Sequence, residues 1–304
     1  MHQHHGHDHH HHHSPAAMTG KAFMAGIVLN SIYVIAQLAA GLYTNSVALI
    51  TDAVHNLGDV AMLIISFVAL KLARIKPNES YTYGYKKSTI LAVFINAVIL
   101  LIAIGTLGYE SVVRLGHPEP IKGNIVAWVA ALGIIINAVS AFFFFKDKER
   151  ELNAKSAYLH LLSDALVSLG VVVAGIIVSY TGWYWLDPVV SIIILLVILY
   201  STWSLLSDSL RLSLDGVPRD VDIVHIESII RSVMGVNQLH HTHIWAMSTT
   251  ENALTTHVIL DEQLSFEAKM KVVHEIKHVL LHEHIQHATI EIESLAMPCD
   301  GKDC

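Results

Sequence analysis

Long apolar segments constrain this chain more than any other feature of its sequence. A helix needs roughly 20 apolar residues to cross about 30 Å of hydrocarbon. Six segments of about that length occur, at residues 22–43, 46–70, 88–112, 124–145, 156–180 and 186–207. The composition agrees, because 53% of the residues are hydrophobic and only 15% are charged. The sequence therefore predicts an α-helical membrane protein with six transmembrane helices.

The remainder of the chain, after the last apolar segment, reads as a small soluble domain. Gly216 and Pro218 interrupt the chain there. The pattern beyond them predicts helices at about 220–233 and 265–284 and strands at about 238–247, 253–261 and 287–294. This αββαβ order favours a small sheet covered by helices on one face. We therefore expect three regions: a disordered histidine-rich tail (1–20), the six-helix transmembrane domain (21–208) and an α+β domain (209–304).

Basic residues predict the orientation. Lysines and arginines gather between the second and third segments and between the fourth and fifth, namely Lys71, Arg74, Lys76, Lys86, Lys87, Lys146, Lys148, Arg150 and Lys155. The opposite loops hold Arg114 and Lys122. Because cytoplasmic loops carry the excess of positive charge, both termini and the soluble domain should be cytoplasmic. The first 20 residues also lack the pattern of a cleavable secretory signal.

The two chain ends carry residues that bind metals. The amino end, MHQHHGHDHHHHH, is either an affinity tag or a natural metal-collecting tail. Cys299 and Cys304 are the only cysteines, and a cytosolic position favours free or metal-binding thiols over a disulfide. The formal charge of -7 gives no indication of nucleic-acid binding.

Two HxxxD pairs lie inside predicted membrane segments. His55 and Asp59 share one helix face, and so do His160 and Asp164. An unpaired charge at the bilayer centre costs roughly 2.5–3.5 kcal/mol, so these groups need compensation. Two imidazoles and two carboxylates converging from two helices would suit tetrahedral Zn²⁺. The alternative is that the four residues only form hydrogen bonds between helices.

Asp52 lies three residues before His55. One alternative is that Asp52 supports the metal site without being a ligand, either by shaping it or by lining the water path to it. The other is that Asp52 lies near the membrane surface. The sequence leaves both alternatives open.

Three segments resemble the cation diffusion facilitator family, specifically its zinc-transporting bacterial-type members. They are SVALITDAVHNLGD, YTYGYKKSTILAVFINAVILL and NAKSAYLHLLSDALVSLGVVVAG, and the resemblance spans most of the chain. It implies a homodimeric six-helix transporter with a cytoplasmic ferredoxin-like domain, in the bacterial inner membrane, that exchanges cytosolic Zn²⁺ for protons. The four HxxxD residues match the family's transport site. Members with aspartate in place of His55 tend to accept Cd²⁺ as well, so His55 favours stricter zinc selectivity.

The resemblance also implies zinc sites in the cytoplasmic domain. Positions like His240, His257, Glu291 and Glu293 help to tie two subunits together in the family, where zinc acts as a structural or regulatory ion. Glu291 departs from members that have histidine there, and the alternative for these histidines is an ordinary surface role. In a regular strand His240 and His243 point to opposite faces, so they should not share one site. The loop KLARIKPNES lacks the Asp and His that bind an extra metal in some relatives, so we expect no such site.

One motif favours a different class of function. HEIKH, residues 274–278, fits the HExxH signature of zinc proteases, which would make the chain a membrane-tethered metalloprotease. The apolar stripe of this helix, however, leaves His274, Glu275 and His278 facing solvent. A catalytic site also needs a third ligand and a cleft. A membrane-bound zinc sensor without transport activity is the other alternative.

Overall fold

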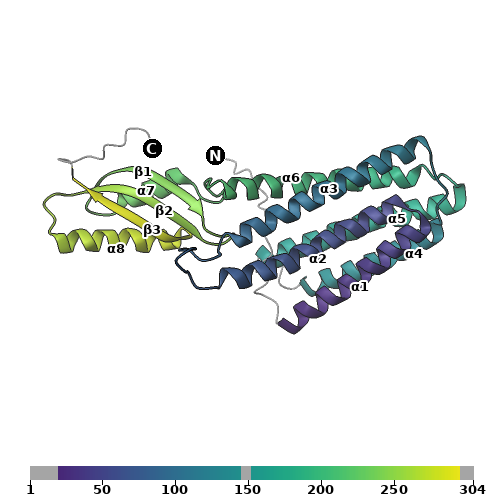
Figure 1. Cartoon of the computed structure of the whole chain (residues 1–304), viewed down its shortest axis with the longest axis horizontal. Coiled ribbons are helices and arrows are strands. Elements are labelled where there is room, and N and C mark those ends of the chain that lie inside the picture. Colours follow the sequence, from purple (N-terminus) through teal and green to yellow (C-terminus); the bar gives the residue numbers. More distant parts are fainter. Residues whose placement is uncertain (1–19, 145–151, 295–304) are drawn as a thin grey trace, which may run out of the picture. The chain divides into compact units, whose positions relative to one another are not determined.

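The computed structural model describes residues 20–144 and 152–294, which form six long helices followed by a small α/β part (Figure 1). The long helices are α1 (Gly20–Thr44), α2 (Val47–Ala73), α3 (Ser88–Gly116), α4 (Gly123–Phe144), α5 (Leu152–Thr181) and α6 (Leu186–Ser213). The α/β part contains α7 (Ile223–Ser232), β1 (Val236–Ala246), β2 (Asn252–Leu260), α8 (Phe266–His282) and β3 (Ile285–Glu293). The predicted order of elements is confirmed.

Each of the six predicted apolar segments forms one of the helices α1–α6. Within the described residues, five helices are long and apolar enough to cross a membrane, and these are α2 to α6. Helix α1 is not among the five, and it carries the polar residues Asn30, Ser31 and Gln37. The histidine-rich tail, Cys299 and Cys304 lie outside the described residues.

Exposure along these helices is the reverse of that in a soluble protein. Large apolar side chains face outward, for example Ile102 at 63% and Leu166 at 61% exposure. Polar side chains lie inside, and Gln37 and Ser168 are fully buried. A helix bundle surrounded by lipid distributes its residues in this way, because hydrocarbon solvates apolar side chains and leaves polar ones without partners.

The chain divides into two compact units. The first contains the described residues up to Phe67 together with Asn96–Trp203, and the second contains Val68–Ile95 together with the described residues from Ser204 onward. In the first unit, α4 packs against both α5 and α1. A Cβ on Gly123 would lie 2.4 Å from the carbonyl oxygen of Gly175, so these two glycines allow the backbones of α4 and α5 to approach closely.

The start of α2 is held by a residue from a distant helix. Asp187, at the start of α6, accepts hydrogen bonds from Ser46 Oγ at 2.5 Å and from the amide of Val47 at 2.7 Å. Asp187 therefore satisfies amide groups that the first turn of α2 leaves free, and its negative charge favours the positive end of that helix. Asn45, with φ of 59°, makes the tight turn between α1 and α2.

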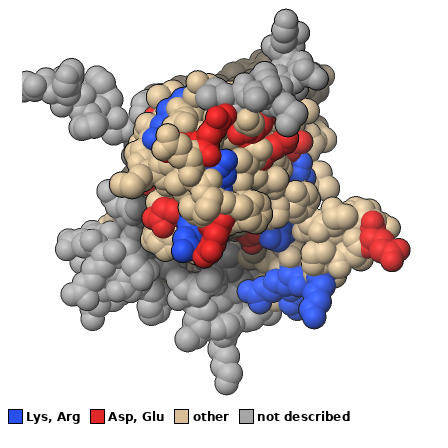
Figure 2. Space-filling view, turned by 90° about the vertical axis from the view of Figure 1, so that its left-hand side faces the viewer, with Lys and Arg blue, Asp and Glu red and all other residues tan. Residues whose placement is uncertain are grey.

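The sheet of the second unit has the order β1-β2-β3. β1 and β2 are antiparallel, whereas β2 and β3 are parallel. Helices α7 and α8 pack on β1 and β3 and against each other, which covers one face of the sheet as predicted. The core between helices and sheet includes Ile226, Leu254 and Ile276, all buried. On the face shown in Figure 2, acidic and basic side chains are interspersed, as on an ordinary solvated surface.

The connection between α2 and α3 also belongs to the second unit. Lys86 forms an ion pair with Glu251 in the β1–β2 loop, and Lys87 Nζ lies 2.6 Å from Asp215 Oδ1. The amide of Thr249 donates a hydrogen bond to Thr89 Oγ1 at 3.1 Å. These contacts attach the first residues of α3 and the loop before it to the α/β part.

Candidate metal centres

Helices α2 and α5 bring the two HxxxD pairs together. His55 Nε2 lies 3.3 Å from Asp164 Oδ1, and His160 Nε2 lies 3.4 Å from Asp59 Oδ2. Within each pair, His160 Nε2 is 3.5 Å from Asp164 Oδ2 and His55 Nε2 is 3.9 Å from Asp59 Oδ2. Nitrogen and oxygen atoms therefore alternate around a common centre, and each histidine contacts a carboxylate of both helices.

These spacings match the ligand set of one small cation. Metal–ligand bonds of about 2.0–2.2 Å in a tetrahedron place neighbouring ligand atoms roughly 3.3–3.6 Å apart. Three of the four distances fall in that range, whereas the His55–Asp59 distance of 3.9 Å is longer, and Asp164 contacts the two histidines through different carboxylate oxygens. His55, Asp59 and Asp164 offer ligand atoms that all lie within 4.8 Å of one another; His160 is outside that group but contacts both carboxylates.

Exposure differs among the four side chains. Asp164 is 6% exposed and His55 is 15% exposed, whereas Asp59 and His160 are 28% and 38% exposed. In the α2 pair, Asp59 is nearer to the helix end at Ala73. In the α5 pair, His160 is nearer to the helix start at Leu152. The two members of the cluster that lie nearer to these helix ends are therefore the more exposed ones.

Asp52 lies beside this cluster and is fully buried. Its Oδ2 accepts a hydrogen bond from Gln37 Nε2 of α1 at 2.7 Å and one from Ser168 Oγ of α5 at 3.2 Å. Gln37 in turn accepts a hydrogen bond from Asn56. Gln37 of α1 and Ser168 of α5 enclose this carboxylate of α2, which favours the alternative that Asp52 supports the site from outside the ligand set.

A second cluster lies on the sheet of the α/β part. Glu293 bridges two histidines, with Oε1 at 2.5 Å from His257 Nδ1 and Oε2 at 3.0 Å from His240 Nε2. Glu291 Oε2 is 3.6 Å from His257 Nε2. The structure therefore brings all four residues of the predicted cytoplasmic set together, and Glu293 is the most buried of these four side chains, at 6% exposure.

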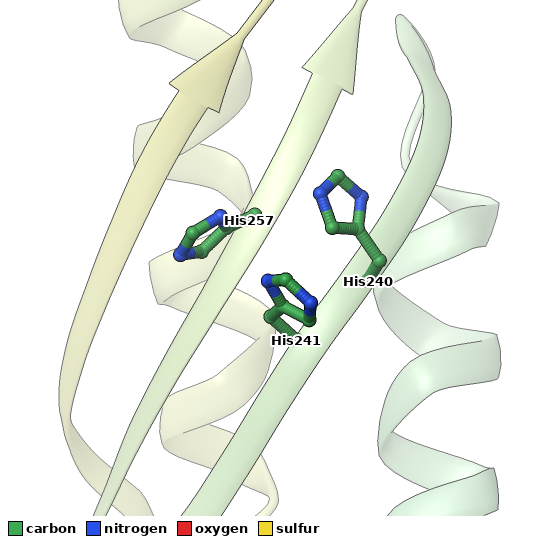
Figure 3. Close-up of side chains that lie close together, drawn as sticks. All are labelled: His240, His241 and His257. Carbon is green, nitrogen blue, oxygen red and sulfur yellow. The ribbon is translucent and has the colours of Figure 1, made fainter. Parts of the chain in front are cut away.

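His241 joins this cluster and was not predicted. Figure 3 shows the rings of His240, His241 and His257 close together on two neighbouring strands. The ring centroid of His241 lies 5.1 Å from that of His257, and their ligand atoms lie within 4.8 Å of those of His240. The cause is a register shift between His240 and His243, where His241 adopts a positive φ of 51°. This bulge brings two consecutive side chains into one cluster, whereas His243 is exposed outside it.

The HEIKH segment forms part of α8, with His274, Glu275 and His278 exposed. The buried residues of this helix are Ile276 and Leu280, so the predicted solvent-facing orientation is confirmed. Within the described part of the chain, no group of residues close enough to share a metal ion includes these three. The arrangement offers no third ligand of the kind that a zinc protease requires.

Comparisons with known proteins agree with this architecture. Residues 23–212 match the family model for the cation efflux transmembrane domain, and residues 218–295 match the cytoplasmic domain of cation efflux proteins. The chain is 38% identical over 285 residues to the metal cation efflux system protein CzcD of Cupriavidus metallidurans, an alignment covering 93% of this chain and 89% of that one.

Two further relatives are similarly close. The zinc transporter ZitB of Escherichia coli is 33% identical over 275 residues, covering 90% of this chain and 86% of ZitB. A cadmium, cobalt and zinc/H⁺-K⁺ antiporter of Bacillus subtilis is 32% identical over 278 residues, covering 91% and 89%. The matches confirm the predicted fold class, a helical transmembrane region followed by a cytoplasmic domain, and a transporter rather than an enzyme. This chain belongs to the cation efflux family, the cation diffusion facilitators.

Proposed function

We propose that this chain exports Zn²⁺ from the cytosol in exchange for protons, and that His55, Asp59, His160 and Asp164 hold the ion during transport. The observation that carries the proposal is the alternation of imidazole nitrogens and carboxylate oxygens from α2 and α5 at 3.3–3.9 Å. Two carboxylates neutralise a divalent ion, which allows it to bind where little water is present. Two imidazoles favour Zn²⁺ over Mg²⁺ and Ca²⁺, which prefer oxygen ligands.

Exchange with protons follows from the energetics of export. Moving a divalent cation out against an inside-negative potential costs about 4.6 kcal/mol per 100 mV, at roughly 2.3 kcal/mol per charge. Inward proton flow can drive this step. Imidazole and carboxylate groups bind metal only when deprotonated, so protons and Zn²⁺ compete for the same four side chains. Alternating access would expose the cluster to each side of the membrane in turn.

The names of the relatives support zinc as the substrate. ZitB is a zinc transporter, and the Bacillus subtilis protein is named for cadmium, cobalt and zinc. For the present chain we propose preference for Zn²⁺ over Cd²⁺, since the resemblance associates this preference with a histidine at position 55.

In the membrane, we propose residues 21–208 as the transport domain and 209–304 as the cytoplasmic domain, with both termini in the cytoplasm of a bacterial inner membrane. The excess of lysine and arginine in the loops after α2 and α4 supports this orientation. The greater exposure of Asp59 and His160, the members nearer to this end of α2 and α5, supports access from the cytosol.

We also propose that the cluster of His240, His257, Glu291 and Glu293 binds Zn²⁺ as a structural or regulatory ion in a homodimer. Support comes from the 2.5 Å and 3.0 Å contacts that Glu293 makes with the two histidines. A buried carboxylate between two imidazoles is a suitable start for a zinc site, which needs further ligands from this chain or its partner.

Zinc uptake into inverted membrane vesicles with an imposed pH gradient tests the transport proposal. His160→Ala and Asp164→Ala should each abolish uptake, because each removes one of the four ligands. His282→Ala and Asp220→Ala, which change exposed residues of the cytoplasmic domain, are matched controls and should transport normally. Transport that survives in either ligand variant would show that the ion binds elsewhere. Zinc binding without any flux in the unmodified protein would instead favour a sensor.

A further inference from the structure

Asp52 is a buried acidic group that the four-ligand site does not use. The side chain is fully buried, and its Oδ2 accepts both of its hydrogen bonds, from Gln37 and Ser168. Its Oδ1 has no hydrogen-bond partner among the described residues. Both donors are neutral, so neither compensates the charge of an ionised carboxylate.

No permanently charged cation lies against this carboxylate within the described residues. The ionisable side chains near it within the described residues include Tyr33 of α1, His55 of α2 and Asp164 of α5. Helix α4, which packs against α1 and α5, contains no ionisable residue. Among these groups only His55 can carry a positive charge, and it is paired with Asp164 at 3.3 Å. A lone buried carboxylate costs several kcal/mol unless a cation neutralises it.

The groups around Asp52 do not suit the transported metal. Zn²⁺ binds a set of three or four Cys, His or carboxylate ligands. Asp52 accepts hydrogen bonds from Gln37 and Ser168, and Asn56 donates to Gln37, so the neighbouring groups are amides and a hydroxyl, with Asp52 as the one carboxylate. One carboxylate balances a single positive charge, so this position suits a proton or a monovalent ion rather than Zn²⁺.

We propose that Asp52 is a second cation position, which holds a monovalent counter-cation, either a proton or an alkali ion, separate from the four metal ligands. It precedes His55 by three residues, about 4.5 Å along the helix axis, toward the start of α2. The position of Ser168, one turn beyond Asp164 on α5, places it on the same side of the metal cluster. A cation at Asp52 and a divalent ion at the cluster repel each other, so binding of one favours release of the other.

This inference rests on the proposed antiport, and its test compares Asp52→Asn with the unmodified chain in proteoliposomes. Asparagine keeps the shape of Asp52 and an acceptor for Gln37 and Ser168, but loses the charge. We expect zinc binding to persist and the number of counter-cations exchanged per zinc ion to fall by about one. Proton flux is followed with an internal pH dye, in buffers of potassium, sodium or choline, so that a proton and an alkali ion are distinguished. Thr106→Ala, which removes an exposed hydroxyl of α3 that bonds to Ala103 of its own helix, is the control and should keep the exchange ratio.

Infrared spectroscopy of the purified, metal-free protein gives a readout that does not require transport. If the cation is a proton, a protonated carboxyl band is present, is lost in Asp52→Asn and shifts in Ser168→Ala. If it is an alkali ion, the band is absent and binding of potassium or sodium is lost in Asp52→Asn. An unchanged exchange ratio, or a carboxylate that is ionised without any bound cation in all three buffers, would overturn the proposal. Because the infrared and ion-binding results stand without flux, failure of the antiport proposal is distinguished from failure of this one.

Discussion

His55 Nε2 lies 3.3 Å from Asp164 Oδ1, although 109 positions separate the two residues in the chain. This contact joins the two HxxxD pairs across α2 and α5 and makes the site depend on the packing of both helices. With the geometry fixed by this packing, the choice of metal should depend on the chemical type of each ligand, including the imidazole of His55.

Replacing His55 with aspartate should widen the range of metals transported. His55→Asp exchanges an imidazole for a third carboxylate, and oxygen-rich sites discriminate less strongly in favour of Zn²⁺. We expect the ratio of Cd²⁺ to Zn²⁺ transport to rise by about tenfold, or about 1.4 kcal/mol. A competition assay in vesicles measures this ratio. His55→Ala is the control and should lose transport of both ions, whereas an unchanged ratio in His55→Asp would exclude His55 as the selectivity determinant.

His241 should contribute to zinc binding by the cytoplasmic domain. Its ring belongs to the cluster with His240 and His257, so His241→Ala removes a potential ligand. We expect zinc affinity of this site to fall by about tenfold or more, or about 1.4 kcal/mol. Calorimetric zinc titration of the full chain measures it, with His240→Ala as a positive control. His243→Ala changes a nearby exposed histidine outside the cluster and should leave the zinc affinity unchanged. If His241→Ala and His243→Ala have equal effects on the affinity, His241 is not a ligand.

Asp187 should stabilise the start of α2. Asp187→Ala removes the acceptor for Ser46 and Val47 in a buried setting, and loss of a buried, charged hydrogen-bond acceptor costs about 1–3 kcal/mol or more. The variant should unfold at a lower temperature than the unmodified protein in the same detergent. Asp220→Ala, at an exposed position, should unfold at the original temperature. If both variants are equally stable, Asp187 does not hold α2.

The HEIKH segment should have no catalytic role. Glu275 would be the general base of a zinc protease, yet it is exposed on α8 with no third metal ligand nearby among the described residues. Glu275→Gln should leave zinc transport unchanged. Casein digestion by the purified, zinc-loaded protein should be at background in both forms. A digestion rate that falls in the variant would restore the protease interpretation.

The sequence predicted those parts of the molecule that follow from local periodicity. Helix lengths follow from the apolar segments, and the spacing of four residues places His160 and Asp164 on one face of α5. The αββαβ order followed from the alternation of apolar residues in the strands.

Three features depend on contacts between distant segments and could not be predicted. Strict alternation along β1 fails at the bulge, where the positive φ of His241 brings it beside His240. The burial of Asp52 depends on Gln37, which comes from a different helix. Asp187 reaches the start of α2 only through the packing of α6. For the bulge in β1, the only local signal in the sequence was the pair of adjacent histidines, His240 and His241.

The central claim is that one zinc ion binds between the two HxxxD pairs. Anomalous diffraction from crystals of the protein grown with Zn²⁺ tests it most directly. We predict a peak within about 2.0–2.2 Å of His55 Nε2, His160 Nε2 and one carboxylate oxygen each of Asp59 and Asp164. Zinc bound at the cytoplasmic cluster, with no peak between α2 and α5 at saturating zinc, would contradict the account.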